Sequence, residues 1–233
     1  MSYAKSISDA VRRVIDSDPC VQECLERRVV SYSGLAKKIQ PLVEKLIGSP
    51  VSLNAVKIAI TRYKPPEARG VTHPRRRIIE LLANSTLELR TGVSVLTAYN
   101  TALGKVLSML PDLANKSRLL LLLFSINTFT IIIDREHLNV IRDAIRDEIV
   151  EVHDDQTAVI VVSPHEIVET PGFVAYITSL VAREGLNITQ IESSYTDTIL
   201  IMRSDEAIKA FNILLKSIEV AREQLSPPTG SSQ

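Results

Sequence analysis

Cysteine is scarce in this sequence of 233 residues, in which Cys20 and Cys24 are the only two. They lie four residues apart in a segment with helical periodicity, so the thiols would share one helix face without the geometry of a disulfide. No further Cys or His lies near them, which excludes a metal site built on these thiolates. We expect both thiols to be buried or half-buried.

Long apolar runs and a leader are also missing. The longest apolar run, "LLLLLF" from Leu119 to Phe124, is far shorter than the ~20 residues that a membrane span needs. No cationic leader with an apolar centre opens the sequence, and we therefore expect a cytoplasmic protein. An apolar fraction of 45% with 23% charged residues is typical of a soluble globular chain rather than a disordered one.

The residue patterns of catalysis do not occur. No nucleophile has a base at a usable spacing, and no phosphate-binding loop or cluster of metal ligands is present. The four histidines are scattered, at His73, His137, His153 and His165. The sequence therefore predicts a protein that is not an enzyme and that needs no metal or cofactor.

Charge is balanced overall but not locally, since the net charge is zero. Residues 1–77 contain 15 Lys and Arg against 7 Asp and Glu, a net +8, whereas residues 78–233 contain 12 against 20, a net −8. This asymmetry indicates two modules with different partners, and the basic one is the candidate for binding a polyanion.

Helical periodicity dominates the first seventy or so residues. Two helices are predicted over Lys5–Ser17 and Pro19–Val30, and Asp18 is the expected cap of the second. A longer apolar stripe runs over residues 35–47, where Pro41 should kink or restart the helix.

A turn and a last helix complete this part. Gly48, Ser49 and Pro50 should end the third helix, and Ser52 should cap the fourth. The last two helices thus form a helix, a tight turn and a second helix. The buried face of the fourth helix is predicted to contain Val56, Ala59 and Ile60.

Further along, the pattern changes to strands and helices. A short linking helix is predicted over 74–82, and from Ser85 the order strand, helix, strand, strand, helix occurs twice. An α+β fold with two tandem ferredoxin-like units is the expected form. The predicted domains are a helical domain at 1–70, a linker helix at 71–84, a first unit at 85–155, a second unit at 156–225 and a disordered tail at 226–233.

The second unit lacks a closing strand, because its last helix runs straight into the tail. An extra strand-like stretch, "TLELR" from Thr86 to Arg90, precedes the first unit. We expect this stretch to fill the vacancy, which would leave the two units interleaved.

The second unit also has a recognisable signature. A strand and a loop are followed by "PGFVAYITSLVAREGLNI", an alternating strand and a hairpin. This order resembles an ACT domain, and the pair of units resembles the tandem ACT module of aspartokinases. The resemblance covers residues 157–218 well and 86–152 weakly, because no Pro-Gly turn precedes "TALGKVLSML" and no Gly-x-Asn-Ile follows it. No kinase domain is present.

ACT domains are regulatory modules that bind amino acids or similar ligands at the loop after the first strand, often across two copies. By position, this resemblance implies a site formed by Pro164, His165, Glu166, Glu169, Pro171, Gly172, Phe173, Asn187 and Ile188. Helix N-termini favour a carboxylate, and Gly185 allows the turn that leads to Asn187. The alternative is that Pro-Gly is only a turn that starts a helix.

The N-terminal helices resemble a helix-turn-helix, although the segment before the turn is longer than usual and contains Pro41. Residues off the apolar stripe and after the prolines are of types that contact bases and phosphates: Asn54, Lys57, Thr61, Arg62, Arg75, Arg76 and Arg77, alongside His73. A solvated helix face and an exposed linker are the alternatives.

These patterns favour a cytoplasmic transcriptional regulator that binds DNA through its helical domain and senses an amino acid through tandem ACT domains as a homodimer or higher homo-oligomer. Two alternatives stay open: a regulatory adaptor that docks on a metabolic enzyme, and a structural oligomerisation module without a ligand.

Overall fold

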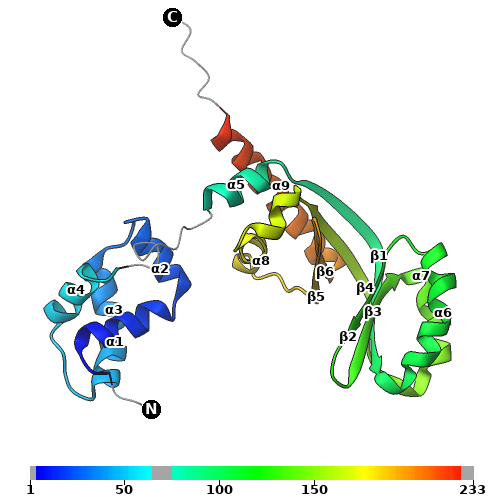
Figure 1. Cartoon of the computed structure of the whole chain (residues 1–233), viewed down its shortest axis with the longest axis horizontal. Helices are drawn as coiled ribbons and strands as arrows, with labels where there is room; N and C mark the ends of the chain where they lie inside the picture. Colours follow the sequence, from blue (N-terminus) through cyan, green and yellow to red (C-terminus); the bar gives the residue numbers. More distant parts are fainter. Residues whose placement is uncertain (1–3, 65–74, 227–233) are drawn as a thin grey trace, which may run out of the picture. The chain divides into compact units, whose positions relative to one another are not determined.

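The computed structural model describes residues 4–64 and 75–226. The chain divides into two compact units, Met1–His73 and Pro74–Gln233 (Figure 1). Three predicted features lie outside the described residues: His73, the first part of the predicted linker helix at 71–74, and the predicted tail from 227 to 233. Within the described ranges, no helix combines the length and the apolar character that crossing a bilayer requires.

The first unit, which we call the head, consists of helices in its described residues. Each helix begins at a side chain that accepts a hydrogen bond from a first-turn amide: Ser6, Asp18, Ser31 and Ser52. One apolar cluster joins all four helices. Their bounds are α1 Ile7–Asp16, α2 Pro19–Glu26, α3 Tyr32–Ile47 and α4 Leu53–Thr61.

The second helix is shorter than predicted, and the third is not interrupted. α2 ends at Glu26 because the chain turns at Arg28, which has a positive φ of 55°. α3 continues through Pro41 as one helix, so the expected restart there is wrong. Pro41 is exposed, so its ring lies on the solvent side. α3 ends at Gly48, which adopts the left-handed conformation with φ 82°.

Both cysteines, Cys20 and Cys24, lie within α2 as free thiols. Cys24 is half-buried as expected, but Cys20 is exposed because it lies in the first turn of the helix, away from the head core.

The second unit is an antiparallel sheet with helices. Its strands follow the order β2-β3-β1-β4-β6-β5. The elements are α5 Arg75–Ala83, β1 Thr86–Tyr99, α6 Leu103–Lys116, β2 Leu120–Phe124, β3 Thr128–Asp134, α7 Arg135–Ala144, β4 Ile149–Val162, α8 Phe173–Arg183, β5 Gln190–Ser194, β6 Asp197–Arg203 and α9 Ser204–Leu225. Short 3-10 turns lie at Asn100–Ala102, Arg146–Glu148 and His165–Glu169.

The two ferredoxin-like units share two long strands, β1 and β4, which confirms the predicted interleaving. The first half of β1, including "TLELR", pairs with the second half of β4, from Thr86 opposite Val162 to Arg90 opposite Ala158. The second half of β1 pairs with β3 and with the first half of β4. Each long strand therefore closes one ferredoxin-like unit and opens the other.

A bulge in each shared strand keeps the correct face toward the helices. β1 has an extra residue at Gly92, with φ 71°, and β4 has one between His153 and Gln156. Without these residues the alternation of side chains would place the second half of each strand with its apolar face reversed.

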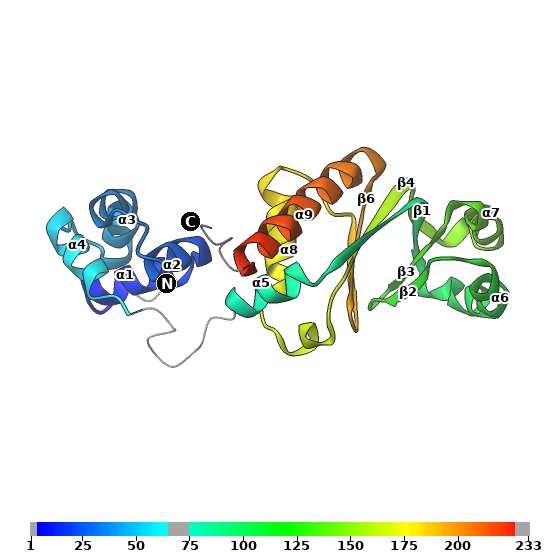
Figure 2. The ribbon, with the colours of Figure 1, turned by 90° about the horizontal axis from the view of Figure 1, so that it is seen from above.

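The sheet curls between two helical layers. α6 and α7 cover one half of it, and α5, α8 and α9 cover the other (Figures 1 and 2). The helix-free face also has buried apolar side chains, among them Val95, Ile132, Ala158 and Ile201. These residues are covered because the two halves of the curled sheet close over them.

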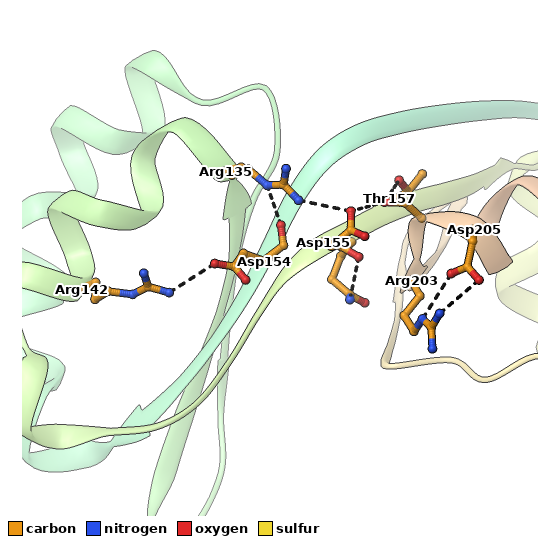
Figure 3. Close-up of polar contacts among 9 residues, drawn as sticks. Arg135, Arg142, Asp154, Asp155, Thr157, Arg203 and Asp205 are labelled. Atoms are coloured by element: carbon orange, nitrogen blue, oxygen red, sulfur yellow. Dashed lines mark hydrogen bonds and ion pairs between the residues drawn. The ribbon is translucent and has the colours of Figure 1, made fainter.

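A polar network fixes the point where β4 passes from one unit to the other (Figure 3). Arg135, at the start of α7, donates from Nε to the Asp154 carbonyl at 2.6 Å and from Nη2 to Asp155 Oδ1 at 3.2 Å. Ser204, at the start of α9, donates to the same Oδ1 at 2.9 Å. The Asp155 carboxylate thus connects α7 of the first ferredoxin-like unit with α9 of the second.

Candidate functional site

The predicted ligand loop follows β4 and leads into α8. Pro164 precedes the 3-10 turn, in which Ile167 is buried in the core beneath α8 and α9. The buried Thr170 hydroxyl donates to the Glu166 carbonyl at 2.7 Å. The loop is also held by internal backbone hydrogen bonds, from Ile167 N to Pro164 O and from Thr170 N to Ile167 O, both 3.1 Å. His165, Glu166 and Glu169 are exposed on it.

The Pro-Gly pair is a turn outside α8 and does not supply its first helical residue. Gly172 is the N-cap, with φ 88°, and no side chain caps the first turn that begins at Phe173. The first amides of α8 therefore have no side-chain acceptor from the cap position, and they are oriented as anion-binding helix termini are.

Two segments outside the predicted loop adjoin it. The Tyr195 ring, at the tip of the β5–β6 hairpin, stacks on His165 with centroids 5.2 Å apart. Tyr195 has a positive φ of 55° and is 68% exposed. Sequence reasoning missed this residue, since nothing in "SSYTD" indicates a tyrosine in the left-handed conformation.

Helix α5 is the second neighbour. A Cβ placed on Gly172 would lie 3.5 Å from Ile78 Cδ1, and Arg77 Nη2 lies 3.9 Å from Glu169 Oε2. The sequence predicted this helix but gave no signal that it packs on the loop.

Asn187 and Ile188 do not lie beside the loop within one chain. The loop begins at the end of β4 where Ser163 N donates to Thr196 O. Thr189, next to Ile188, bonds instead to Gln156 at the other end of that part of the sheet, through its hydroxyl at 2.8 Å. Gly185 makes the predicted turn before them, with φ 70°.

The first ferredoxin-like unit, at 85–155, has a loop in the equivalent position, but this loop differs from the one before α8. Asn100 N donates to Asn127 O at 3.1 Å, just as Ser163 N does to Thr196 O at 2.9 Å. An open pocket there is lined by Tyr99, Asn100, Thr101, Ile126 and Asn127. No Pro-Gly turn precedes α6, as the sequence indicated.

The predicted DNA-binding residues divide between the two units. Asn54, Lys57, Thr61 and Arg62 are all exposed along α4 and at its end, with Thr61 Oγ1 donating to the Lys57 carbonyl at 3.0 Å. Within the described residues no ion pair engages Lys57 or Arg62.

The three consecutive arginines are instead in the first turn of α5. Arg76 pairs with Glu80 at 3.0 Å and Arg77 with Glu169. These pairs compete with any phosphate for two of the three guanidinium groups.

One group of metal-ligand types occurs in the described part of the chain, at Asp134, Glu136 and His137. Asp134 Oδ2 already accepts from the amides of Arg118 at 2.6 Å and Leu119 at 3.4 Å, which ties the start of β2 to the end of β3. This structural role accounts for the buried carboxylate.

Comparison with known proteins identifies the segment that contains the loop. The sequence model of the ACT domain family matches residues 151–216, which run from β4 to α9. This segment is an ACT domain. The match includes the Pro-Gly loop. It omits Thr86–Arg90, the segment of β1 that pairs with β4 and so completes this ACT domain. No curated protein matches the chain.

Solved structures similar to the chain include regulatory parts of aspartate kinases. Clostridium acetobutylicum aspartate kinase is 17% identical over 57% of this chain and 34% of that one, with a TM-score of 0.49. The ligand-free regulatory subunit of aspartate kinase from Thermus thermophilus is 15% identical over 56% of this chain and 95% of that one, with a TM-score of 0.47. The chain thus spans about a third of the Clostridium enzyme.

Proposed function

We propose that this protein is a cytoplasmic, non-catalytic transcriptional regulator that senses an amino acid through its ACT pair and binds DNA through the head. The observation that carries the proposal is the uncapped N-terminus of α8 at Gly172, within the segment that matches the ACT family. An amino acid offers a carboxylate to such a terminus and an ammonium to a nearby acidic group.

The effector site in this proposal uses both charged ends of the amino acid. The carboxylate accepts from the first amides of α8, with Pro164, Pro171 and Phe173 shaping the loop around it. Glu166 and Glu169, the exposed acidic groups of the loop, are placed to receive the ammonium. The stacked His165 and Tyr195 form one wall.

A second copy of the chain completes this site. Asn187 and Ile188 lie at the far end of the sheet from their own loop, so they can contact an effector only at the loop of a partner. The proposal therefore requires a homodimer, and two heads related by a twofold axis suit a palindromic operator.

A thermal-shift screen tests the effector site. We expect at least one of the twenty proteinogenic amino acids to raise the melting temperature, because a ligand that binds only the folded state stabilises it. The shift should disappear in Gly172→Val and shrink in Asn187→Ala. An unchanged melting temperature with all twenty would overturn amino-acid sensing.

The DNA-binding half rests on the exposed Lys57 and Arg62 of the head. Retention on duplex DNA should fall with salt, and the double variant Lys57→Ala/Arg62→Ala should reduce the salt slope by about 2, about one unit per lost phosphate contact. Lys105→Ala/Lys116→Ala in the ACT pair is the matched control and should leave the slope unchanged. Equal slopes in all three proteins would contradict the assignment.

The adaptor alternative is favoured by the internal pairing of Arg76 and Arg77, which leaves less free charge for a polyanion. In that case the protein would bind the amino acid but show no salt-dependent retention on DNA.

A further inference from the structure

Helix α5 covers the end of α8 at which the proposed effector would bind. Ile78 lies against Gly172, 3.5 Å from the position of an added Cβ, and is 7% exposed. It belongs to the same apolar cluster as Ile167 of the loop and Phe173 of α8. An apolar methyl group therefore occupies the space beside the residue that opens the helix.

The charged groups of α5 and the loop reinforce this contact. Arg77 pairs with Glu169 at 3.9 Å, one helical residue before Ile78. Both side chains are exposed to solvent, so the pair adds little free energy. Docking thus depends mainly on Ile78 and on Leu81, Leu82 and Ala83, which belong to the same apolar cluster.

The C-terminal end of α5 is fixed, which makes it a pivot. The buried Ser85 hydroxyl donates to Leu81 O at 2.8 Å and lies 3.0 Å from Ser163 Oγ. Arg222 of α9 donates to Ala83 O at 2.8 Å and to Ser85 O at 3.2 Å. Strand β1 begins directly afterwards at Thr86.

The N-terminal end of α5 receives the chain from the head. Arg75, Arg76 and Arg77 form its exposed first turn, and residues 65–74 are the covalent connection between this turn and the head. A change in the docking of α5 therefore acts on the segment that leads to the DNA-binding residues.

We propose that α5 is an autoinhibitory latch: its docking through Ile78 against Gly172 and the binding of an amino acid at the first turn of α8 exclude each other. This inference rests on the proposed effector site. Because coupling is reciprocal, an effector that releases α5 must bind more tightly when α5 is already loosened.

Two isoleucine variants of the full chain test the latch. Ile78→Ala removes the contact with Gly172, whereas Ile79→Ala removes the same atoms from a neighbouring position that lines a groove with Gln224 and Leu225 of α9. Each of the twenty proteinogenic amino acids is titrated singly against both variants and the unmodified protein. We expect Ile78→Ala to bind its amino acid at least about fivefold more tightly and Ile79→Ala to match the unmodified protein.

Hydrogen exchange provides a second readout. Amides of residues 75–83 should exchange faster in the unmodified protein when the amino acid that binds is present, since released helices are less protected. Equal affinities of the Ile78→Ala variant and the unmodified protein, or unchanged or slower exchange in α5, would overturn the latch while leaving the effector site intact. Binding of none of the twenty amino acids to any of the three proteins would overturn the effector site and the latch together.

Discussion

Gly172 is the residue on which the geometry of the loop depends most directly. Its φ of 88° is strained for any residue with a Cβ, whereas the methyl group of an alanine would be in ordinary van der Waals contact with Ile78 Cδ1, 3.5 Å away. Gly104, near the start of α6, is different: nothing lies within 4 Å of its Cβ position, and its φ is not positive.

The same substitution at these two glycines should have opposite effects. Gly172→Ala should lower the free energy of unfolding by about 1 kcal/mol or more, since alanine is strained at positive φ. Gly104→Ala should raise it by about 0.5–1 kcal/mol, since alanine is the better helix former. Urea denaturation measures both, and a loss of stability of similar size in both variants would show that the turn is not special.

Glu192 provides a pH dependence on strand β5. Burial raises the pKa of its carboxyl group above the ordinary value. The folded state therefore binds the proton more tightly than the unfolded state, so stability is lost as the pH rises through the folded pKa. Glu192→Gln should melt at a higher temperature than the unmodified protein at pH 7, and the difference should vanish near about pH 3, well below the ordinary pKa of glutamate of about 4.3, where the carboxyl group is protonated in both states. A difference that persists at the acidic pH would contradict this cause.

The two edge strands of the sheet differ in a way that selects a dimer surface. β2 is "LLLLF", with no charge, and Phe124 is 61% exposed. β5 is "QIESS", in which Glu192 discourages pairing. On one face of β2, Leu120 and Leu122 pack on the core beneath α6 and α7. On the other face, Leu121 and Leu123 pack on the core of the helix-free side of the sheet. A twofold-related copy of β2 would continue both cores.

We expect β2 to mediate a further contact between copies of the chain, separate from the contact that brings Asn187 and Ile188 to the loop of a partner. Phe124→Lys places a charge on an already exposed position of this edge and should lower the oligomeric state in light scattering after size-exclusion chromatography. Ile191→Lys, on β5 and 37% exposed, is the control and should leave the contact through β2 unchanged. If only the β5 variant lowers the oligomeric state, β2 is not a contact surface.

Local signals in the sequence were sufficient to predict most elements. Asp18 and Ser52 cap α2 and α4 as expected, and Gly48 ends α3, because capping depends on a few neighbouring residues. Pro41 was misread because an exposed proline can be accommodated within a helix whose other face is buried.

The composition of the candidate site was less predictable. His165, Glu166 and Gly172 share one loop and could be grouped from sequence, whereas Tyr195 and Ile78 reach it only through tertiary packing. Asn187 is distant from the loop because the loop precedes α8 and Asn187 follows it, so the length of the helix separates them. Such relations depend on strand register and helix docking, which no local pattern specifies.

At the scale of the whole molecule, the boundaries of the family match are not the boundaries of a folding unit. Residues 151–216 omit Thr86–Arg90, which pairs with β4 along Val162–Ala158. A fragment of 151–216 would expose that edge of β4 and the apolar core beneath it. We expect this fragment to aggregate on expression and 75–226 to be soluble and monodisperse, and a soluble 151–216 with native-like circular dichroism would contradict the need for the shared strand.

The shared strands also set the order of events when the protein is made. Thr86–Arg90 leaves the ribosome long before Ala158–Val162, the segment with which it pairs. The first half of β4, which completes the first unit, is itself made only after α7. Pairings so distant in sequence are slow to form, so the nascent chain carries the first half of β1 unpaired until the second half of β4 has been made. Translation speed across residues 86–162 is therefore expected to influence the yield of folded protein.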